Sequence, residues 1–279
     1  MKPKKPRHSS PLRYPGGKTA LASFLKKTIR LNGLGGCEYF EPYAGGAGAA
    51  LELLFDGVVE KIHLNDADVR IYSFWRMILR NHTELICRIA SVPLTIEEWR
   101  KQNSIATAPK KHNQFDVGFA TFYMNRCNRS GVITGAGPIG GYEQSGKYLL
   151  DVRFNRASLI QRIEYIAKNR DFISFSNLDA IEFLKQKLPL GNARSNVFAF
   201  LDPPYVVKGQ RLYLNAYDAS DHRKLSRYLH AQSTVKWVMS YDDCSLIRDL
   251  YKKMTVRRFR ISYAPVSYTH LTLPTIYSV

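Results

Sequence analysis

Short apolar segments recur along the chain, and longer amphipathic segments separate them. The short segments have the length of β-strands, and most of them end in polar or glycine-rich residues, as strands do where they leave a sheet. The longer segments have the spacing of apolar residues that is typical of helices. The pattern predicts strands over residues 37–42, 61–65, 172–176, 197–201 and 235–240, and a late strand over residues 255–264.

The alternation of strands and helices predicts the fold class. A helix is expected after the glycine-rich turn at residues 44–48, and another over residues 221–229. Strands separated by helices are typical of a mainly parallel sheet, in which ligands bind at the carboxyl ends of the strands. We therefore expect an α/β protein whose site residues follow directly after its strands.

The pattern changes between residues 70 and 170, where helical segments at 72–79 and 115–123 accompany a glycine-rich loop at 130–146. This stretch holds 16 Lys and Arg against 7 Asp and Glu, a net charge of +9, whereas the whole chain carries +18. Such an excess indicates a polyanionic partner, either nucleic acid or an acidic membrane surface. We expect an inserted, mainly helical module that is specialised for this partner.

Composition limits the possible classes of protein. With 279 residues, 45% of them hydrophobic, the chain can bury a core, and its apolar runs are too short to cross a membrane. The four cysteines are widely spaced, and neither they nor the histidines have the spacing of metal ligands. We therefore expect no metal and a cytoplasmic protein. Residues 1–10 are basic and proline-rich, which predicts a flexible arm.

The most specific motif is Asp202-Pro203-Pro204-Tyr205, which follows the strand predicted at residues 197–201. Proline fixes its backbone angle and has no amide donor, so two prolines hold the turn rigid and leave carbonyl oxygens available. An acceptor carboxylate, a fixed carbonyl and an aromatic ring suit a planar base that bears an amino group. An ordinary strand-ending turn with a surface tyrosine is the simpler interpretation.

A second motif is the turn Tyr43-Ala44-Gly45-Gly46, which follows the first predicted strand. Small residues at this place let a ligand approach the backbone at the N-terminus of a helix. The turn is not a dinucleotide fingerprint, because Leu51 stands where the last glycine would be required. A tight strand-to-helix connection without a ligand explains the same residues.

Two weaker signals complete the set. Residues 11–19 end in Gly-Lys-Thr, which suggests a phosphate-binding loop, but Leu12 occupies the place of the leading glycine. This substitution argues against a nucleoside triphosphatase. Asp66 follows the second predicted strand, where it can accept hydrogen bonds from ribose hydroxyls or cap the next helix.

In their order along the chain, these motifs resemble those of the adenine-specific DNA methyltransferases, the family that includes the DNA adenine methylases. The resemblance covers residues 11–265. It implies a Rossmann-like sheet that binds S-adenosylmethionine, with an inserted, mainly helical target-recognition domain. The implied division is a discontinuous catalytic domain of residues 11–70 and 171–265 and a target-recognition domain of residues 71–170.

The resemblance also implies partners and residue roles. Double-stranded DNA is the expected partner of a monomeric, bacterial or phage-encoded enzyme, which acts alone or beside a restriction enzyme. Residues 125–131 match a segment that lies against DNA in the family, and residues 240–242 match a further signature. The implied cofactor contacts are Tyr14, Lys18, Tyr43, Ala44, Gly45, Gly46, Asp66, Asp179 and Asp202; the catalytic residues are Asp202, Pro203 and Tyr205; and the DNA contacts are Arg126, Asn128 and Arg129.

The implied mechanism begins with extrusion of adenine from the duplex, because a stacked base cannot reach the methyl donor. Tyr205 would stack on the extruded base and recover about 1–3 kcal/mol. Asp202 and the Pro203 carbonyl would accept the hydrogens of the amine, which attacks the methyl group directly. A catalytically inactive DNA-binding relative, and an enzyme that acts on RNA or cytosine, are the alternatives; the acid at position 202 favours adenine.

Residues 266–279 follow the family-like part of the chain, and residues 266–275 resemble the conceptual translation of a sequencing-library adapter more than any segment of the family. We therefore expect a non-native tail after Pro265. Because a further strand normally follows at this point, its loss would leave an unpaired strand edge. A genuine, divergent tail that forms a strand is the alternative.

Overall fold

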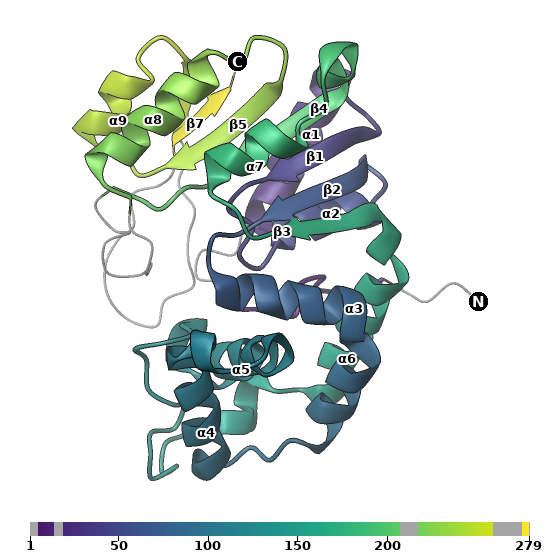
Figure 1. Cartoon of the computed structure of the whole chain (residues 1–279), viewed down its shortest axis with the longest axis vertical. Coiled ribbons are helices and arrows are strands. Elements are labelled where there is room, and N and C mark those ends of the chain that lie inside the picture. The colour runs from purple at the N-terminus through teal and green to yellow at the C-terminus, as the bar shows by residue number, and fades with distance from the viewer. Residues whose placement is uncertain (1–4, 14–18, 207–216, 259–274, 279) are drawn as a thin grey trace.

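A computed structural model describes residues 5–13, 19–206, 217–258 and 275–278. These residues form two bodies, an α/β body at the top of Figure 1 and a helical module below it. The chain leaves the α/β body after β2 and returns to it at β3, so the module is an insertion between two neighbouring strands. The α/β body is therefore discontinuous in sequence.

The sheet has the strand order β3-β2-β1-β4-β5-β7-β6. β1 to β5 are parallel to one another, and β7 is antiparallel to both β5 and β6. This arrangement confirms the α/β, Rossmann-like fold predicted from the sequence. The strands are β1 (Cys37–Glu41), β2 (Val59–Asn65), β3 (Ile173–Ser176), β4 (Val197–Leu201), β5 (Lys236–Tyr241), β6 (Thr255–Arg258) and β7 (Thr275–Ser278).

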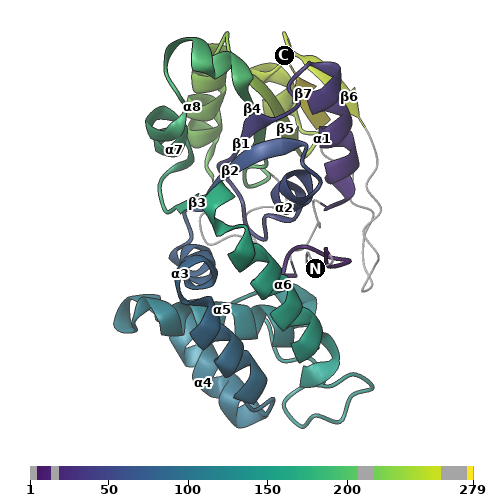
Figure 2. The same ribbon diagram turned by 90° about the vertical axis from the view of Figure 1, so that its right-hand side faces the viewer.

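Helices cover both faces of the sheet (Figure 2). Alternate strand residues enter different cores: Tyr39 of β1 packs in one and Phe40 in the other. This alternation follows from the two-residue period of a strand and explains why the parallel strands are apolar throughout. The helices on one face are α1 (Thr19–Leu31) and α2 (Gly48–Phe55), and those on the other are α7 (Ala180–Lys187), α8 (Ala219–His230) and α9 (Ser245–Leu250).

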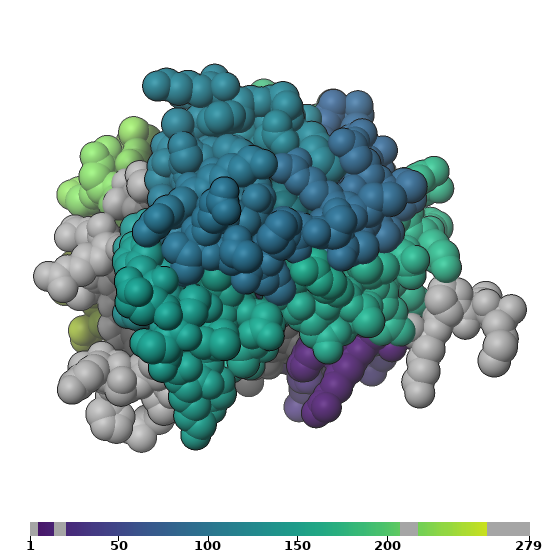
Figure 3. All heavy atoms as spheres, turned by 90° about the horizontal axis from the view of Figure 1, so that it is seen from below, coloured from purple at the N-terminus to yellow at the C-terminus, as the bar shows by residue number. Residues whose placement is uncertain are grey.

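The helical module is arranged around α5, in which every residue from 117 to 127 is buried. Its neighbours α3 and α4 pack along it, and α6 packs on α3. Seen from below, the module occupies the centre of the face in view (Figure 3). Its helices are α3 (Val69–Ser91), α4 (Ile96–Thr107), α5 (Gln114–Cys127) and α6 (Arg156–Lys168). Short 3₁₀ turns are η1 (Pro109–Lys111), η2 (Arg129–Gly131), η3 (Leu150–Arg153), η4 (Arg170–Phe172) and η5 (Gly191–Asn196).

Gly118 marks the closest approach of α5 to α3, because a Cβ atom at this position would lie 2.6 Å from the carbonyl oxygen of Ser73. We expect Gly118→Ala to lower the free energy of unfolding by about 1–3 kcal/mol, since the two helices must separate. Gly35→Ala is the matched control, because its added Cβ would meet nothing within 4 Å. Thermal unfolding compares the two variants, and equal melting temperatures would contradict this packing.

Residues 5–13 lie against the α/β body and the module. Lys5 forms ion pairs of 2.5 Å with Glu52 and Asp56, and the Ser9 hydroxyl donates to Glu52 at 2.6 Å. Ser10 donates to the carbonyl oxygen of Gly46 at 2.5 Å. Residues 5–10 therefore pack on the α/β body rather than extending as part of the flexible arm predicted over residues 1–10, of which residues 1–4 lie outside the described part of the chain.

The five predicted parallel strands lie within two residues of β1 to β5. The late strand predicted over residues 255–264 corresponds to β6 over its first four residues, and the rest lies outside the described part of the chain. Residues 275–278 form β7, which pairs with both β5 and β6. The prediction of an unpaired strand edge is therefore wrong for β5, because the backbone of these four residues lies between β5 and β6 and pairs with both.

Candidate active site

Two loops meet at the carboxyl edge of the sheet, between β1 and β4. These strands are hydrogen-bonded neighbours, and the chain proceeds from β1 toward β3 on one side and from β4 toward β5 on the other. A crevice at such a reversal of strand order is the usual ligand site of an open α/β sheet. β1 is followed by the glycine turn, residues 42–47, and β4 by the Asp-Pro-Pro-Tyr turn, residues 202–205, so the fold brings the two motifs together.

The glycine turn is built from small, buried residues. Ala44 donates its amide to the carbonyl of Asn65 at 2.9 Å, and the indole of Trp75 donates to the carbonyl of Gly45 at 2.8 Å. Gly45 has a φ of 49°, in the left-handed region that favours glycine. α2 begins at Gly48 without a side-chain cap, so its first amides face the loop edge without a side-chain acceptor.

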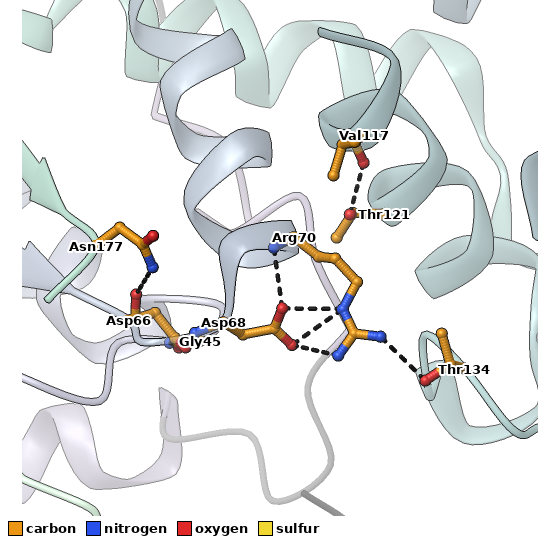
Figure 4. Close-up of polar contacts among 8 residues, drawn as sticks. All are labelled: Gly45, Asp66, Asp68, Arg70, Val117, Thr121, Thr134 and Asn177. Carbon is orange, nitrogen blue, oxygen red and sulfur yellow. Dashed lines mark hydrogen bonds and ion pairs between the residues drawn. The ribbon is translucent and has the colours of Figure 1, made fainter. Parts of the chain in front are cut away.

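Asp66 lies beside this turn, and backbone amides hold both of its carboxylate oxygens (Figure 4). Oδ2 accepts from the amide of Gly45 and Oδ1 from the amide of Asp68, each at 2.9 Å. The Asn177 side chain donates to the Asp66 carbonyl at 2.8 Å. The carboxylate thus joins the glycine turn to the start of α3.

In the Asp-Pro-Pro-Tyr turn, side chains from the end of β5 hold the acid in place. The Ser240 hydroxyl donates to Oδ1 of Asp202, and the Tyr205 hydroxyl lies 3.4 Å from the same oxygen. The amide of Val206 donates to Asp242 at 3.0 Å. The segment at residues 240–242 therefore supports both ends of the turn, which gives this sequence signature a physical role.

A chain of aromatic side chains connects the glycine turn to the end of β5 through α8, and the sequence reasoning missed two of its members, Tyr217 and His222. The hydroxyls of Tyr43 and Tyr217 are 2.8 Å apart, and His222 Nδ1 lies 2.7 Å from the hydroxyl of Tyr241. Burial raises the pKa of Tyr217 to about 12 and lowers that of His222, so both side chains are neutral near pH 7. Tyr43 and Tyr241 belong to segments singled out from the sequence, but nothing local marks Tyr217 and His222, because their partners lie on distant elements.

Of the three remaining predicted cofactor contacts outside the two turns, the structure places only one. Asp179 caps α7, where its carboxylate accepts from the amides of Ile181 and Glu182 at 2.9 and 3.3 Å. It lies after β3, at the same edge of the sheet as the glycine turn. Tyr14 and Lys18 lie outside the described residues.

Arg126 lies in the interior of the module. Its guanidinium donates to the carbonyl of Arg153, at 2.6 Å from Nε, and to the carbonyl of Pro11 at 3.4 Å. Burial, reinforced by the neighbouring charges of Arg13 and Arg162, lowers its pKa to about 9. A direct contact between Arg126 and a DNA phosphate therefore does not fit this geometry, because its donors are directed at backbone carbonyls.

Asn128 is also buried, whereas Arg129 is exposed. The Asn128 side chain accepts from the Trp99 indole at 2.7 Å and donates to the carbonyls of Val132 and Ile133 at 2.8 and 3.2 Å. Its side chain thus closes loop 128–138 instead of facing solvent. Of the three predicted DNA contacts, only Arg129 presents its side chain at the surface.

Two further residues fix the loop against the cofactor segments. The Asn125 side chain accepts from the amide of Arg13 and donates to its carbonyl, both at 2.6 Å, as a neighbouring β-strand would. Arg70 connects Asp68 to Thr134. Asn125 belongs to a segment singled out from the sequence, but the Arg70 contacts join elements that no linear motif connects.

The part of the chain that the structure describes contains no cluster of three or more His, Cys, Asp or Glu side chains that could hold a metal ion. Within the same residues, no helix has both the length and the apolarity required to cross a lipid bilayer.

A glycine turn and an Asp-Pro-Pro-Tyr turn at the switch point of a Rossmann-like sheet define a methyltransferase that uses S-adenosylmethionine. The chain matches the D12 class N6 adenine-specific DNA methyltransferase family over residues 14–264. It belongs to this family, and it is an enzyme whose substrate is adenine in DNA. A comparison with curated proteins gave no match.

Proposed function

We propose that the loops after β1 and β4, at the carboxyl edge of the sheet, bind S-adenosylmethionine, with Asp66 as the acceptor for the ribose hydroxyls. The donor set fits this ligand: a carboxylate already oriented by two amides stands beside uncapped amides at the start of α2. Residues 43–46 form the turn itself, and Asp179 lies at the same carboxyl edge of the sheet. We include Tyr14 and Lys18 as further cofactor contacts because they belong to the motif of the family at residues 11–19.

We further propose that Asp202, Pro203 and Tyr205 bind the extruded adenine. The amine donates one hydrogen to the Asp202 carboxylate and another to the Pro203 carbonyl, which directs its lone pair toward the methyl group. S-adenosylmethionine supplies an electrophilic methyl group to this site. Ser240 and Asp242 hold the turn in advance, so the catalytic contribution is orientation and preorganised charge. No metal is needed for this step.

The single observation that carries the proposal is the pairing of the glycine turn and the Asp-Pro-Pro-Tyr turn on adjacent strands. The test is transfer of a labelled methyl group from S-adenosylmethionine to unmethylated duplex DNA, followed by digestion to nucleosides. We expect the label in N6-methyldeoxyadenosine. Label in methylated cytosine, or no transfer, would contradict the proposal.

On the DNA side, we propose that Arg129 contacts a phosphate and that Arg126 and Asn128 position the loop which carries it. Arg129→Ala should weaken DNA binding and reduce the slope of log K against log salt by about 0.9, the effect of losing one phosphate contact. Arg223→Ala removes an equally exposed arginine from α8 and serves as the control. A salt titration in which the slope of the Arg129 variant equals that of wild type would show that this arginine does not touch the backbone.

We also propose that the enzyme is a monomer that acts in the cytoplasm on double-stranded DNA, alone or beside a restriction enzyme. The charge of the chain supports the binding of DNA: it is +18 overall, and half of it lies in residues 70–170. Such a charge attracts DNA from solution and raises the rate of association at low salt.

A further inference from the structure

Arg70 occupies a buried position at the start of α3 and uses its guanidinium in two directions (Figure 4). Nε lies 2.9 Å from one oxygen of Asp68, and Nη2 lies 2.6 Å from the other. Nη1 donates to the hydroxyl of Thr134 at 3.1 Å. Thr134 belongs to the helical module, whereas Asp68 belongs to the loop after β2, so this one side chain joins the two bodies.

The contact continues from Asp68 to the glycine turn. The amide of Asp68 donates to Asp66, and the other Asp66 oxygen accepts from the amide of Gly45. Each step in this path is a hydrogen bond of about 3 Å with defined direction. A shift of Thr134 therefore acts on the carboxylate that the proposed function assigns to the methyl donor.

At the other end, Thr134 moves with the surface that faces DNA in the proposed function. The amide of Arg129 donates to the carbonyl of Gly137 at 3.1 Å, and Ile139 donates to the carbonyl of Cys127 at 2.9 Å. Together with the Asn128 side chain, these bonds close loop 128–138 into one unit. Because these bonds hold the loop together, a displacement of Arg129 is expected to displace Thr134 as well.

Arginine at position 70 has a geometric property that an apolar residue lacks. A buried ion pair contributes little net stability, and apolar residues of similar volume often replace such a pair without loss of stability. A guanidinium, however, presents several donors in a fixed plane, so it can hold a carboxylate and a hydroxyl in one geometry at the same time. This property suits a residue that aligns two sites.

We propose that Arg70 is a positioning residue that couples the methyl-donor site to loop 128–138, so that DNA and the methyl donor each bind more tightly when the other is present. The proposal rests on the proposed roles of Asp66 and Arg129. Coupling of this kind is reciprocal: DNA must strengthen donor binding by the factor by which the donor strengthens DNA binding.

The test measures the dissociation constant of S-adenosylhomocysteine, which cannot transfer a methyl group, by titration calorimetry with and without a short DNA duplex. The duplex carries the site that sequencing of methylated bases identifies for this enzyme. We expect S-adenosylhomocysteine to bind the wild-type protein at least about fivefold more tightly with the duplex than without it. Thr134→Val should lose most of this factor, while its dissociation constant without DNA stays within about twofold of wild type.

Two controls separate this relay from general damage to the module. Thr121→Val is the matched substitution, because the Thr121 hydroxyl donates to the carbonyl of Val117 within α5 and does not belong to the path (Figure 4). It should keep the full coupling factor, and Thr134→Ser should restore it. Arg70→Lys keeps the charge but loses the planar arrangement of donors, so it should behave like Thr134→Val.

The outcomes distinguish the relay from the function on which it rests. Failure of the wild-type protein to bind S-adenosylhomocysteine would overturn the proposed donor site itself, and the relay with it. Donor binding that DNA does not strengthen would overturn the relay alone. Equal coupling factors in wild type, Thr134→Val and Arg70→Lys would also overturn it. The contacts from Thr134 to Asp66 would then contribute nothing to the coupling free energy between DNA and the methyl donor.

Discussion

Asp202→Ala is expected to lower the rate of methyl transfer by at least about a hundredfold to a thousandfold, the usual effect of removing a preorganised electrostatic partner from a reacting group. In the proposed mechanism the carboxylate is the acceptor that directs the lone pair of the amine, and water cannot replace it in the same geometry. The measurement is the single-turnover rate at saturating S-adenosylmethionine and DNA, so that weaker binding does not contribute.

Asp249→Ala provides the matched control, because it removes an exposed carboxylate from α9 in the same body. It should retain the wild-type rate. Asp202→Ala also leaves the buried Ser240 hydroxyl without this acceptor, so the melting temperature of each variant is recorded. A folded Asp202→Ala protein with near-normal turnover would contradict the assigned chemistry.

Tyr205→Ala is expected to lower methyl transfer by about tenfold to a hundredfold, because the extruded base loses a stacking surface that contributes about 1–3 kcal/mol. Tyr205→Phe keeps the ring and removes only a hydroxyl that lies 3.4 Å from Asp202, so it should retain most of the activity. The difference in rate between the two variants separates the contribution of the ring from that of its hydroxyl.

A fluorescent adenine analogue at the target position offers a second readout for the Tyr205 pair, since stacking quenches its emission. Quenching should be weaker in the alanine variant than in wild type and unchanged in the phenylalanine variant. If both variants lost activity equally, the hydroxyl and not the ring would be the important group.

The parts of the site that were predictable from sequence are those encoded in short strings beside strands. A buried strand of five residues followed by Asp-Pro-Pro-Tyr identifies the end of β4 and is the basis for the chemistry proposed at that end. Since carboxyl ends of parallel strands share one edge, the proximity of this turn to Tyr43 and Gly45 follows from the fold class alone. Composition alone was also enough to locate the basic module.

The side chains that sequence reasoning misplaced are polar residues whose partners are distant in the chain. Arg126 is predicted to contact DNA because residues 125–131 match a segment that lies against DNA in the family. In the structure it binds the carbonyls of Arg153 and Pro11, 27 and 115 positions away. No local pattern predicts such contacts, because a buried arginine and an exposed one have the same sequence signature.

The two ends of the described chain illustrate the same limit. The basic and proline-rich composition of residues 5–10 predicts flexibility, yet Lys5 and Ser9 pair with the carboxylate of Glu52 on α2. Similarly, residues 275–278 have no family signature, but their backbone completes the sheet between β5 and β6. Strand pairing uses backbone groups rather than side chains, so a sequence without a family motif can still form a strand of the sheet.

The most direct test of the central claim is single-molecule methylome sequencing of DNA from methylation-deficient cells that express either the wild-type chain or Asp202→Ala. The account predicts N6-methyladenine at one recurring short site in the first sample and its absence in the second. Methylation of cytosine, or the same adenine signal in both samples, would contradict the assignment of an adenine methyltransferase whose catalysis depends on Asp202.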